Sequence, residues 1–220
     1  MIKLFETEDG SHSLYSEEFQ VSYHSKFGAI QETKHVFIEA GLKYKAVLKK
    51  ELKVLDIGFG TGLNAFMTLL EAEKKGLQVD YTGVEAFPVD WDTAQKLNYP
   101  ELTGHPEKQD DFHKLHGDNW GETIKYSDTF TGTKLKKKFQ DLNFESQFDI
   151  IYFDAFAPGS QPELWEGDVM QIMHNALVKG GILVTYCAKG DVKRTLKAIG
   201  FEVEKLLGPP GKREMTRAIK

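Results

Sequence analysis

Short apolar runs alternate with longer amphipathic stretches along most of the chain. Four of these runs have the length and the β-prone residues of strands covered on both faces: 53–57, 79–84, 150–153 and 182–186. A stretch with the apolar spacing of a helix follows each run: 63–75, 89–97, 162–177 and 192–199. Because strands that alternate with helices form parallel βαβ units, the pattern predicts a doubly wound α/β domain with a mostly parallel sheet.

Two regions have a different pattern. Residues 98–145 are long and polar, and we expect them to hold a third strand near 134–139 and an insertion over the carboxyl edge of the sheet. Residues 19–42 precede the first strand and predict an entrance segment followed by a helix.

The end of the chain predicts a terminal antiparallel pair of strands, 201–207 and 214–219. No repeat or linker divides the chain, so we expect one compact domain. In it, residues 1–50 form an N-terminal extension and entrance helix, packed on a core of residues 51–220.

The composition narrows the class of protein. With 40% hydrophobic residues among 220, the chain is too apolar for a disordered segment, and no apolar stretch approaches the roughly 20 residues that span a bilayer. The first ten residues contain acidic side chains where a signal peptide needs basic ones, so we expect a cytoplasmic protein. The single cysteine, Cys187, excludes an intrachain disulfide and is interpreted as a small core residue near a strand end.

Positive charge is concentrated late in a chain whose net charge is −5. Residues 188–220 contain nine Lys or Arg and four Asp or Glu, a net of +5, so the preceding residues total −10. A second basic run comprises Lys134 and residues 136–138. The distribution permits a nucleic-acid interface, although a short lysine run is more often a solvated face.

A glycine-rich segment follows the first predicted strand, at the edge where ligands bind in doubly wound sheets. Glycines at alternate positions allow a tight turn and a close approach to a ligand, and the opening helix offers free N–H groups to a carboxylate such as that of S-adenosylmethionine (SAM). The spacing G-x-G-x-G differs from the dinucleotide motif G-x-G-x-x-G, which disfavours NAD and FAD. The candidate cofactor-binding residues of this segment are Asp56, Gly58, Gly60, Gly62 and Asn64.

Acidic residues at the ends of other strands extend this candidate site. Glu85 ends the second strand, where a carboxylate can accept hydrogen bonds from both hydroxyls of a ribose. Asp141, near the third strand, is a candidate for the adenine amino group, with a solvated loop residue as the equal alternative. Asp154 follows the fourth strand in the segment DAFAP.

Six segments then match one family in order: YHS at 23–25, LDIGFGTGLN at 55–64, FDIIYFDAFAP at 148–158, QPELW at 161–165, GGILVTYCAKG at 180–190 and GPPGKREM at 208–215. In these segments the chain resembles the MnmC-like methyltransferase family, the methyltransferase part of the tRNA 5-methylaminomethyl-2-thiouridine biosynthesis protein. Residues 102–141 are longer and less similar than the family pattern, and Gln161 stands where an asparagine is common.

The resemblance implies a Rossmann-like class I SAM-dependent methyltransferase fold, with SAM as the cofactor. It implies methylation of the aminomethyl group on the wobble uridine of tRNA, from 5-aminomethyl-2-thiouridine to 5-methylaminomethyl-2-thiouridine. In the two-part proteins an FAD-dependent oxidoreductase follows, so we expect a stand-alone methyltransferase whose substrate is prepared by a separate oxidoreductase-type enzyme.

The resemblance also suggests roles for individual residues. Asp154 is the candidate catalytic residue, which orients the amine, stabilises the positive charge that develops on nitrogen and also contacts the cofactor. Phe156 is expected to form an apolar wall, and Trp165 is either a base-stacking residue or part of the core. Candidate contacts to tRNA phosphates are Lys189, Arg194, Lys212, Arg213 and Arg217, each with solvated surface as its alternative.

The histidines suggest no metal centre. His113 and His116 are three residues apart, but no third ligand is near them in the sequence, so we expect no metal dependence. His24 is expected either to line the cofactor entrance or to have a structural role.

Three functions remain open. The first is tRNA wobble-uridine amine methylation, and the second is small-molecule amine methyl transfer or aminopropyl transfer. Aminopropyltransferases usually have a further acidic residue in the glycine turn, where this chain has Thr61. The third is a non-catalytic SAM-binding or RNA-binding module, against which the acidic residues Glu85 and Asp154 argue.

Overall fold

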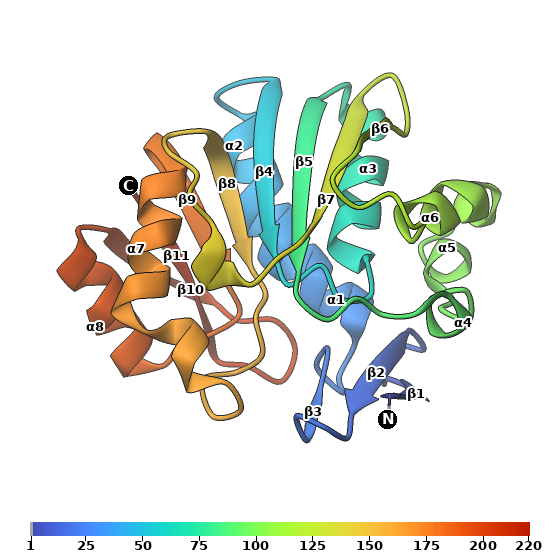
Figure 1. Cartoon of the computed structure of the whole chain (residues 1–220), viewed down its shortest axis with the longest axis horizontal. Helices are drawn as coiled ribbons and strands as arrows, with labels where there is room; N and C mark the ends of the chain where they lie inside the picture. The colour runs from blue at the N-terminus through green and yellow to red at the C-terminus, as the bar shows by residue number, and fades with distance from the viewer. Residues whose placement is uncertain (1) are drawn as a thin grey trace.

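An eight-stranded, mostly parallel sheet forms the centre of the molecule (Figure 1). The computed structural model describes residues 2–220. In spatial order the strands are β10 (Glu202–Leu207), β11 (Glu214–Ile219), β9 (Leu177–Thr185), β8 (Phe148–Phe153), β4 (Glu51–Ile57), β5 (Gln78–Glu85), β7 (Phe130–Lys136) and β6 (Thr123–Lys125). The neighbours from β9 to β7 are parallel, whereas β11, β10 and β6 run antiparallel to the strands they pair with. The predicted doubly wound sheet and its terminal antiparallel pair are confirmed.

The strand order reverses between β4 and β8. From β4 the chain builds outward through β5 to β7, and it then returns to add β8 on the other side of β4. Loops that leave the carboxyl ends of β4 and β8 therefore diverge, and a crevice opens between them. The sequence places the glycine segment after β4 and Asp154 after β8, so both predicted site segments meet at this crevice.

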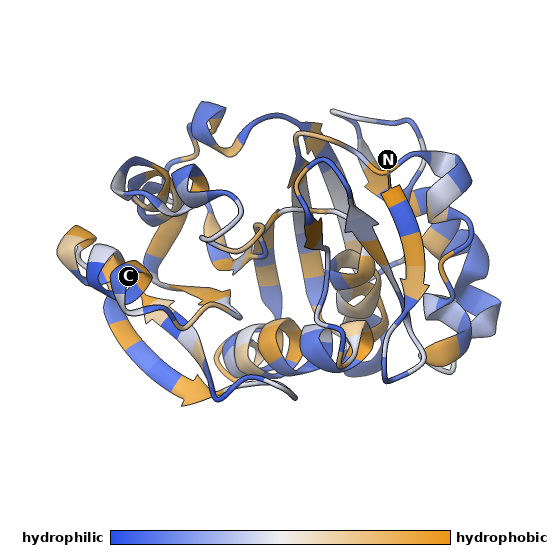
Figure 2. Cartoon of the chain, turned by 90° about the horizontal axis from the view of Figure 1, so that it is seen from below, coloured by the Kyte–Doolittle hydropathy of each residue, from blue (hydrophilic) through white to orange (hydrophobic). Residues whose placement is uncertain are grey.

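Helices cover both faces of the sheet (Figures 1 and 2). On one face lie α1 (Ala29–Thr33), the π-helical segment η1 (Lys34–Lys43), α2 (Tyr44–Ala46) and α3 (Leu63–Lys75), and on the other lie α7 (Gly167–Ala176) and α8 (Gly190–Ile199). Each face of the sheet has its own hydrophobic core. Along β8, Ile150 and Tyr152 belong to the core beneath η1 and α3, and Ile151 and Phe153 belong to the core beneath α7 and α8. Burial on both faces explains why this strand is an unbroken apolar run.

The predicted helices agree with the structure to different degrees. Helix α3 has the predicted bounds 63–75, and α8 begins two residues before the predicted 192. The predicted helix 89–97 is shorter, because Asp90 caps α4 (Trp91–Ala94) and the helix ends within one turn. The predicted helix 162–177 divides into η4 (Pro162–Trp165) and α7.

The polar region 98–145 lies mainly on the flank of the sheet, and the expectation that it covers the carboxyl edge was wrong for most of its length. It contains α5 (Tyr99–Leu102), η2 (Pro106–Lys108), α6 (Gln109–Leu115), β6, β7 and η3 (Phe139–Asp141). Phe112 of α6 packs on Phe66 of α3, with ring centroids 5.3 Å apart, so apolar contact draws this region to the side of α3. The third strand, β7, begins four residues before the predicted start.

A small three-stranded sheet at the N-terminus was not predicted. Its strands are β1 (Ile2–Glu6), β2 (His12–Ser16) and β3 (Val21–Ser22), which lie below the carboxyl edge of the main sheet in Figure 1. The His12 backbone anchors it, since its N–H donates to Asn98 Oδ1 at 2.8 Å and its carbonyl accepts from the Tyr99 hydroxyl at 2.8 Å. The division of the chain at residue 50 stays a prediction. None of the helices within residues 2–220 has both the length and the apolar character that crossing a membrane requires.

Candidate functional site

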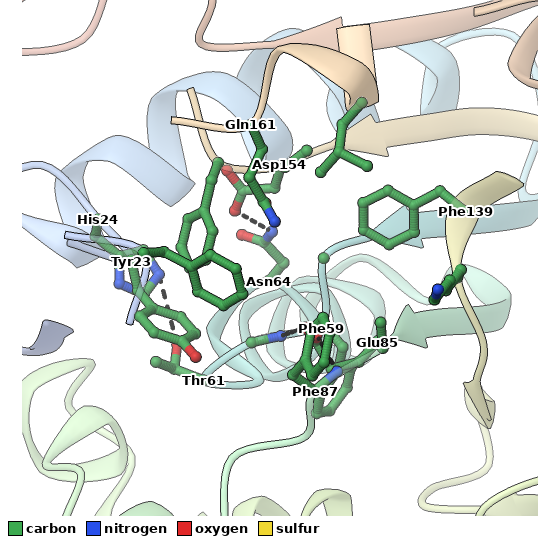
Figure 3. A pocket seen from close by; sticks show the side chains of 18 of the residues that line it. Tyr23, His24, Phe59, Thr61, Asn64, Glu85, Phe87, Phe139, Asp154 and Gln161 are labelled. Carbon is green, nitrogen blue, oxygen red and sulfur yellow. Dashed lines mark hydrogen bonds between the residues drawn. The ribbon is translucent and has the colours of Figure 1, made fainter. Parts of the chain in front are cut away.

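A cavity of about 380 Å³ opens at the carboxyl ends of β4 and β8 (Figure 3). Six of the predicted site residues line it: Gly58, Gly60, Asn64, Glu85, Asp154 and Phe156. The sequence had placed these residues on three different segments, after β4, β5 and β8. Parallel strand pairing brings all three carboxyl ends to one edge.

The glycine turn is shaped by positive φ angles. Gly58, Gly60 and Gly62 have φ values of 93°, 48° and 72°, a region that residues with a Cβ seldom occupy. A Cβ on Gly58 would lie 2.7 Å from the backbone oxygen of Asp154, so the turn passes directly over the end of β8. Gly62 is the N-cap of α3 and lies outside the cavity lining, where a Cβ would meet His116 Nε2 at 2.9 Å. Gly62 therefore helps to form the turn, and its predicted contact with the cofactor stays a prediction.

Glu85 joins the end of β5 to the glycine turn. One carboxylate oxygen, Oε2, accepts the Gly60 N–H at 3.0 Å, and the other accepts the Phe87 N–H at 2.9 Å. Burial raises the pKa of Glu85, although the backbone N–H groups favour its ionised form. Each oxygen keeps a lone pair for a ligand hydroxyl, so the geometry fits the ribose-binding role predicted for this residue.

Asp154 and Asn64 face one another in the cavity wall, with Gln161 beside them in Figure 3. Asn64 Nδ2 donates to Asp154 Oδ2 at 2.9 Å. Burial raises the pKa of Asp154 well above its ordinary value, and the nearby carboxyls of Glu32 and Asp56 raise it further. The site thus holds a carboxyl group whose proton affinity is unusually high for an aspartate.

Asp56 lies beneath the cavity and does not line it. It is fully buried, it accepts the Tyr81 hydroxyl at 2.6 Å, and Asn64 Nδ2 lies 3.4 Å from its other oxygen. Burial raises the pKa of Asp56 to about 7. The predicted cofactor contact is corrected to a supporting role, because Asp56 reaches the site only through Asn64.

An aromatic wall completes the cavity, and the sequence showed only part of it. The Phe156 ring lies 5.1 Å from the Tyr23 ring and 5.6 Å from the Phe19 ring, centroid to centroid. Phe139, after β7, lines another side. Phe19 and Phe139 were missed because neither belongs to a recognisable spacing, although Phe19 opens the predicted entrance segment.

His24 lines the cavity, as one of its two predicted roles required. Its Nδ1 is 3.1 Å from the Ser13 hydroxyl of β2, and its backbone N–H donates to the same oxygen at 3.2 Å. Burial lowers the pKa of His24 to about 4, so the imidazole is neutral at pH 7.

Two other candidates lie outside the cavity. Trp165 is 5% exposed, its Nε1 donates to the Phe156 carbonyl at 2.7 Å, and its ring packs 4.9 Å from Phe153. It is therefore core, which excludes base stacking. Asp141 is exposed at the end of η3, and the adjacent Phe139 and Gln140 line the cavity, so its predicted adenine contact stays a prediction.

Two of the five predicted phosphate contacts, Lys212 and Arg217, are engaged within the protein. Arg217 Nε donates to Glu204 at 2.6 Å, its guanidinium lies 3.6 Å from the Tyr44 ring centroid, and NH1 donates to a backbone carbonyl. Lys212 pairs with Glu32 and lies over the Tyr186 ring.

The remaining basic candidates are more accessible. Arg194 pairs with Asp191 on an exposed surface. Lys189 and Arg213 are exposed and have no ion pair within residues 2–220. Lys212 and Arg217 are thus held by acidic partners and are less available to phosphates than expected, although residues 188–220 keep their net charge of +5.

No cluster of three or more histidine, cysteine or acidic side chains arranged to hold a metal occurs in the part of the chain that the structure describes. His116 Nε2 lies 3.1 Å from the Thr61 carbonyl, whereas His113 contacts Gln109, so the two histidines have separate partners. Cys187 is buried just after β9, as predicted.

The sequence has known relatives. A family of S-adenosyl-L-methionine-dependent methyltransferases matches residues 113–220. Proteins named "tRNA 5-methylaminomethyl-2-thiouridine biosynthesis bifunctional protein MnmC" are 28% identical over 95% of this chain in Marinomonas sp. and 30% identical over 96% in Aromatoleum aromaticum. The matches cover 32% and 34% of those two proteins, so the chain spans about a third of their length.

A solved structure of MNMC2 from Aquifex aeolicus has the same fold. It superimposes with a TM-score of 0.78 and 24% identity, covering 99% of this chain and 70% of that one. Together with the strand order and the cavity at the switch point, these matches confirm the expected family and its cofactor, SAM. Residues 113–220 match the S-adenosyl-L-methionine-dependent methyltransferase family, and the chain as a whole is similar to the MnmC proteins over about a third of their length.

Proposed function

We propose that the protein transfers a methyl group from SAM to the aminomethyl group of 5-aminomethyl-2-thiouridine at the wobble position of tRNA. The observation that carries this proposal is the hydrogen-bonded Asp154–Asn64 pair in the wall of an aromatic cavity. The substrate comes from the similarity to MnmC, which extends over 95% of the chain. The proposal also places the reaction in the cytoplasm, with a separate oxidoreductase-type enzyme that supplies the free amine.

The cavity residues fit SAM. Glu85 offers acceptors for the ribose hydroxyls, and the N-terminus of α3 at Leu63 and Asn64 offers N–H groups to the carboxylate. Gly58 and Gly60 leave the backbone bare where the ligand must pass close to it. Phe139 and Leu164 supply an apolar surface for the adenine. When bound, SAM supplies a methyl group attached to a positively charged sulfur.

Asp154 then has two tasks, which follow from the chemistry of an amine. The nitrogen must lie about 3–3.5 Å from the methyl carbon with its lone pair aligned, and a carboxylate oxygen can hold it there by hydrogen bonding. The nitrogen becomes positive as the new bond forms, and Asp154 stabilises that charge in a site screened from water. An alkylamine has a pKa near ~10.4, and burial raises the pKa of Asp154 toward it, so the carboxyl accepts the amine proton more readily than a solvated aspartate.

Mass analysis of tRNA nucleosides after incubation with methyl-labelled SAM tests this proposal. The tRNA should come from cells that accumulate the aminomethyl form, with tRNA that is already methylated as the matched control. Label on the aminomethyl nucleoside alone is the expected result. Label on free polyamines or other small amines would select the small-molecule alternative, and binding of SAM without any labelled product would select the non-catalytic module.

A further inference from the structure

We propose that an exposed aromatic rim beside the cavity binds unpaired nucleotides of the RNA that flank the nucleotide undergoing methylation. The aromatic rim comprises the exposed side chains of Phe87, Trp91 and Lys136 and the half-buried ring of Phe19. This inference rests on the proposed function and assigns the surface that recognises its substrate. It replaces the C-terminal basic stretch as the main RNA contact.

The rings of the rim continue the wall of the cavity outward. Phe156 and Phe19 lie 5.6 Å apart in the wall, and Phe87 lies a further 5.8 Å from Phe19, centroid to centroid. Phe87 is 56% exposed although it is only two residues beyond Glu85, which lines the cavity. Trp91, on α4, is 44% exposed, and its ring centroid lies 5.0 Å from that of His113. Large apolar rings left open to water beside a binding cavity mark an interaction surface.

Two grooves extend from the cavity along this rim. One, of about 370 Å³, is lined by Phe19, Phe87 and Lys136. The other, of about 540 Å³, is lined by Trp91, Trp120 and Lys136. Phe19 and Phe87 line both the first groove and the cavity, and Phe59 and Gly60 line both the second groove and the cavity. Both grooves therefore adjoin the reaction site. A strand of nucleotides that enters on one side and leaves on the other would place a single nucleotide in the cavity.

The small net charge of the rim leaves the larger share of its RNA affinity to base stacking. Lys136 is exposed at the end of β7, and no ion pair of its side chain occurs within residues 2–220. The grooves also contain Glu18, Asp90 and Asp118, one acidic group more than their two lysines, Lys134 and Lys136. A surface with exposed rings and little net charge draws its affinity from base–aromatic contacts rather than from phosphates. Bases in a duplex are already stacked on each other, so the rim suits unpaired nucleotides.

The test compares an anticodon stem-loop RNA with a fully paired RNA duplex of similar length. The variants are Phe19→Leu and Trp91→Leu, which keep an apolar side chain but remove the ring, and Lys136→Glu. The matched control is Lys50→Glu, which makes the same charge change at an exposed position before β4, at the opposite edge of the sheet. SAM affinity and melting temperature are measured on every variant.

We expect each ring variant to bind the stem-loop about fivefold or more weakly, which is the lower end of the contribution of one base–aromatic stack. SAM affinity should stay within about twofold for Trp91→Leu, which lies outside the cavity lining. Lys136→Glu should weaken stem-loop binding less than the ring variants do. The slope of log affinity against log salt concentration should become shallower by the amount expected for the loss of about one to two phosphate contacts. Lys50→Glu should bind like the wild type, and the duplex should bind the wild type at least about tenfold more weakly than the stem-loop.

Two results would overturn the rim as the RNA surface: unchanged stem-loop affinity in folded ring variants, or equal affinity of the wild type for duplex and stem-loop. If one ring variant unfolds, the other ring variant and Lys136→Glu still test whether the rim binds RNA. Methyl transfer by the wild type to whole tRNA is followed in the same preparation. Its absence rejects the proposed function, whereas methyl transfer with unchanged RNA affinity in the variants rejects the rim alone.

Discussion

Asn64 donates a hydrogen bond of 2.9 Å to Asp154, and this contact joins the first turn of α3 to the end of β8. The Asn64 amide oxygen accepts from the Thr33 hydroxyl at 3.1 Å, which fixes the orientation of the amide. Asn64 therefore holds the Asp154 carboxyl in one position and favours its ionised form, since it donates a hydrogen bond to it.

Replacing Asn64 by alanine should raise the pKa of Asp154 further, because the ionised carboxylate loses a donor. We expect turnover to fall by about 10-fold to 100-fold and the rise of kcat with pH to move to higher pH. The pH dependence of methyl transfer measures this, with Asn143→Ala, the same change at an exposed position, as the control. A lower rate with an unshifted pH profile would show that Asn64 only shapes the cavity.

Replacing Asp154 by asparagine removes the negative charge and keeps the shape. By analogy with the removal of one stabilising group from other active sites, kcat should fall by about 10²-fold to 10³-fold. The dissociation constant of SAM, measured by calorimetry, should change far less. Asp141→Asn, outside the cavity lining, should be silent. Equal losses of turnover and SAM affinity would make Asp154 a cofactor ligand instead.

Gly58→Ala should disrupt the turn and abolish SAM binding, because the added Cβ would lie 2.7 Å from the Asp154 carbonyl oxygen. Gly76→Ala is the matched control: Gly76 also has a positive φ, 61°, but a Cβ there meets nothing within 4 Å. The control should lose only about 1–2 kcal/mol of stability from backbone strain and keep its SAM affinity. Calorimetry and thermal unfolding of both variants measure the contrast. Normal SAM binding by Gly58→Ala would contradict the turn assignment.

The raised pKa of Asp56 predicts a specific pH dependence of stability. An aspartate that ionises near pH 4 when unfolded and at about 7 when folded keeps its proton longer in the folded state, so the folded protein loses stability as pH rises between these values. Asp56→Asn removes this titration. Relative to the variant, the wild type should lose on the order of 3 kcal/mol of unfolding free energy between pH 4 and pH 8. Denaturant unfolding across that range checks it, and a pH-independent difference would show that the folded pKa is ordinary.

Arg217 and Arg213 should contribute different amounts to the stability of the folded protein. Arg217→Ala breaks an ion pair with Glu204 and a stacking contact with Tyr44, and it should cost about 1–3 kcal/mol of stability. Arg213→Ala, at an exposed position four residues earlier, should stay within about 0.5 kcal/mol of the wild type. Thermal unfolding distinguishes them. Equal melting temperatures would mean that the Arg217 contacts are too solvated to stabilise the fold.

The sheet and the turn were predictable because their signals are local. Apolar runs indicate the parallel strands, and the closely spaced glycines indicate a turn, in which Gly58 and Gly60 have positive φ angles. Glu85 and Asp154 could be placed because strand ends of a doubly wound sheet share one edge. These features need no knowledge of distant contacts.

The rest depended on partners that the sequence does not specify. Arg217 looks like a free cation until β10 brings Glu204 beside it, and the choice between a base-stacking and a core role for Trp165 stays open until β8 packs against it. Strand β1 was missed because its residues are only half-buried or exposed, which weakens the alternation that marks a strand. Phe19 reaches the cavity through the small N-terminal sheet, so its role was hidden for the same reason.

The loop between β10 and β11 has a consequence for the order in which the protein assembles. Gly211 lies directly against Phe27, and Lys212 reaches Glu32, whose other oxygen accepts the Ser25 N–H at 2.9 Å. The segment that contributes Tyr23 and His24 to the cavity is thus held by residues about 180 positions later in the chain. Contacts of such long range form late in folding, because a long loop must close first. On the ribosome, the first wall of the cavity to be synthesised is the last to be secured, and the cavity becomes complete only after β11 has emerged.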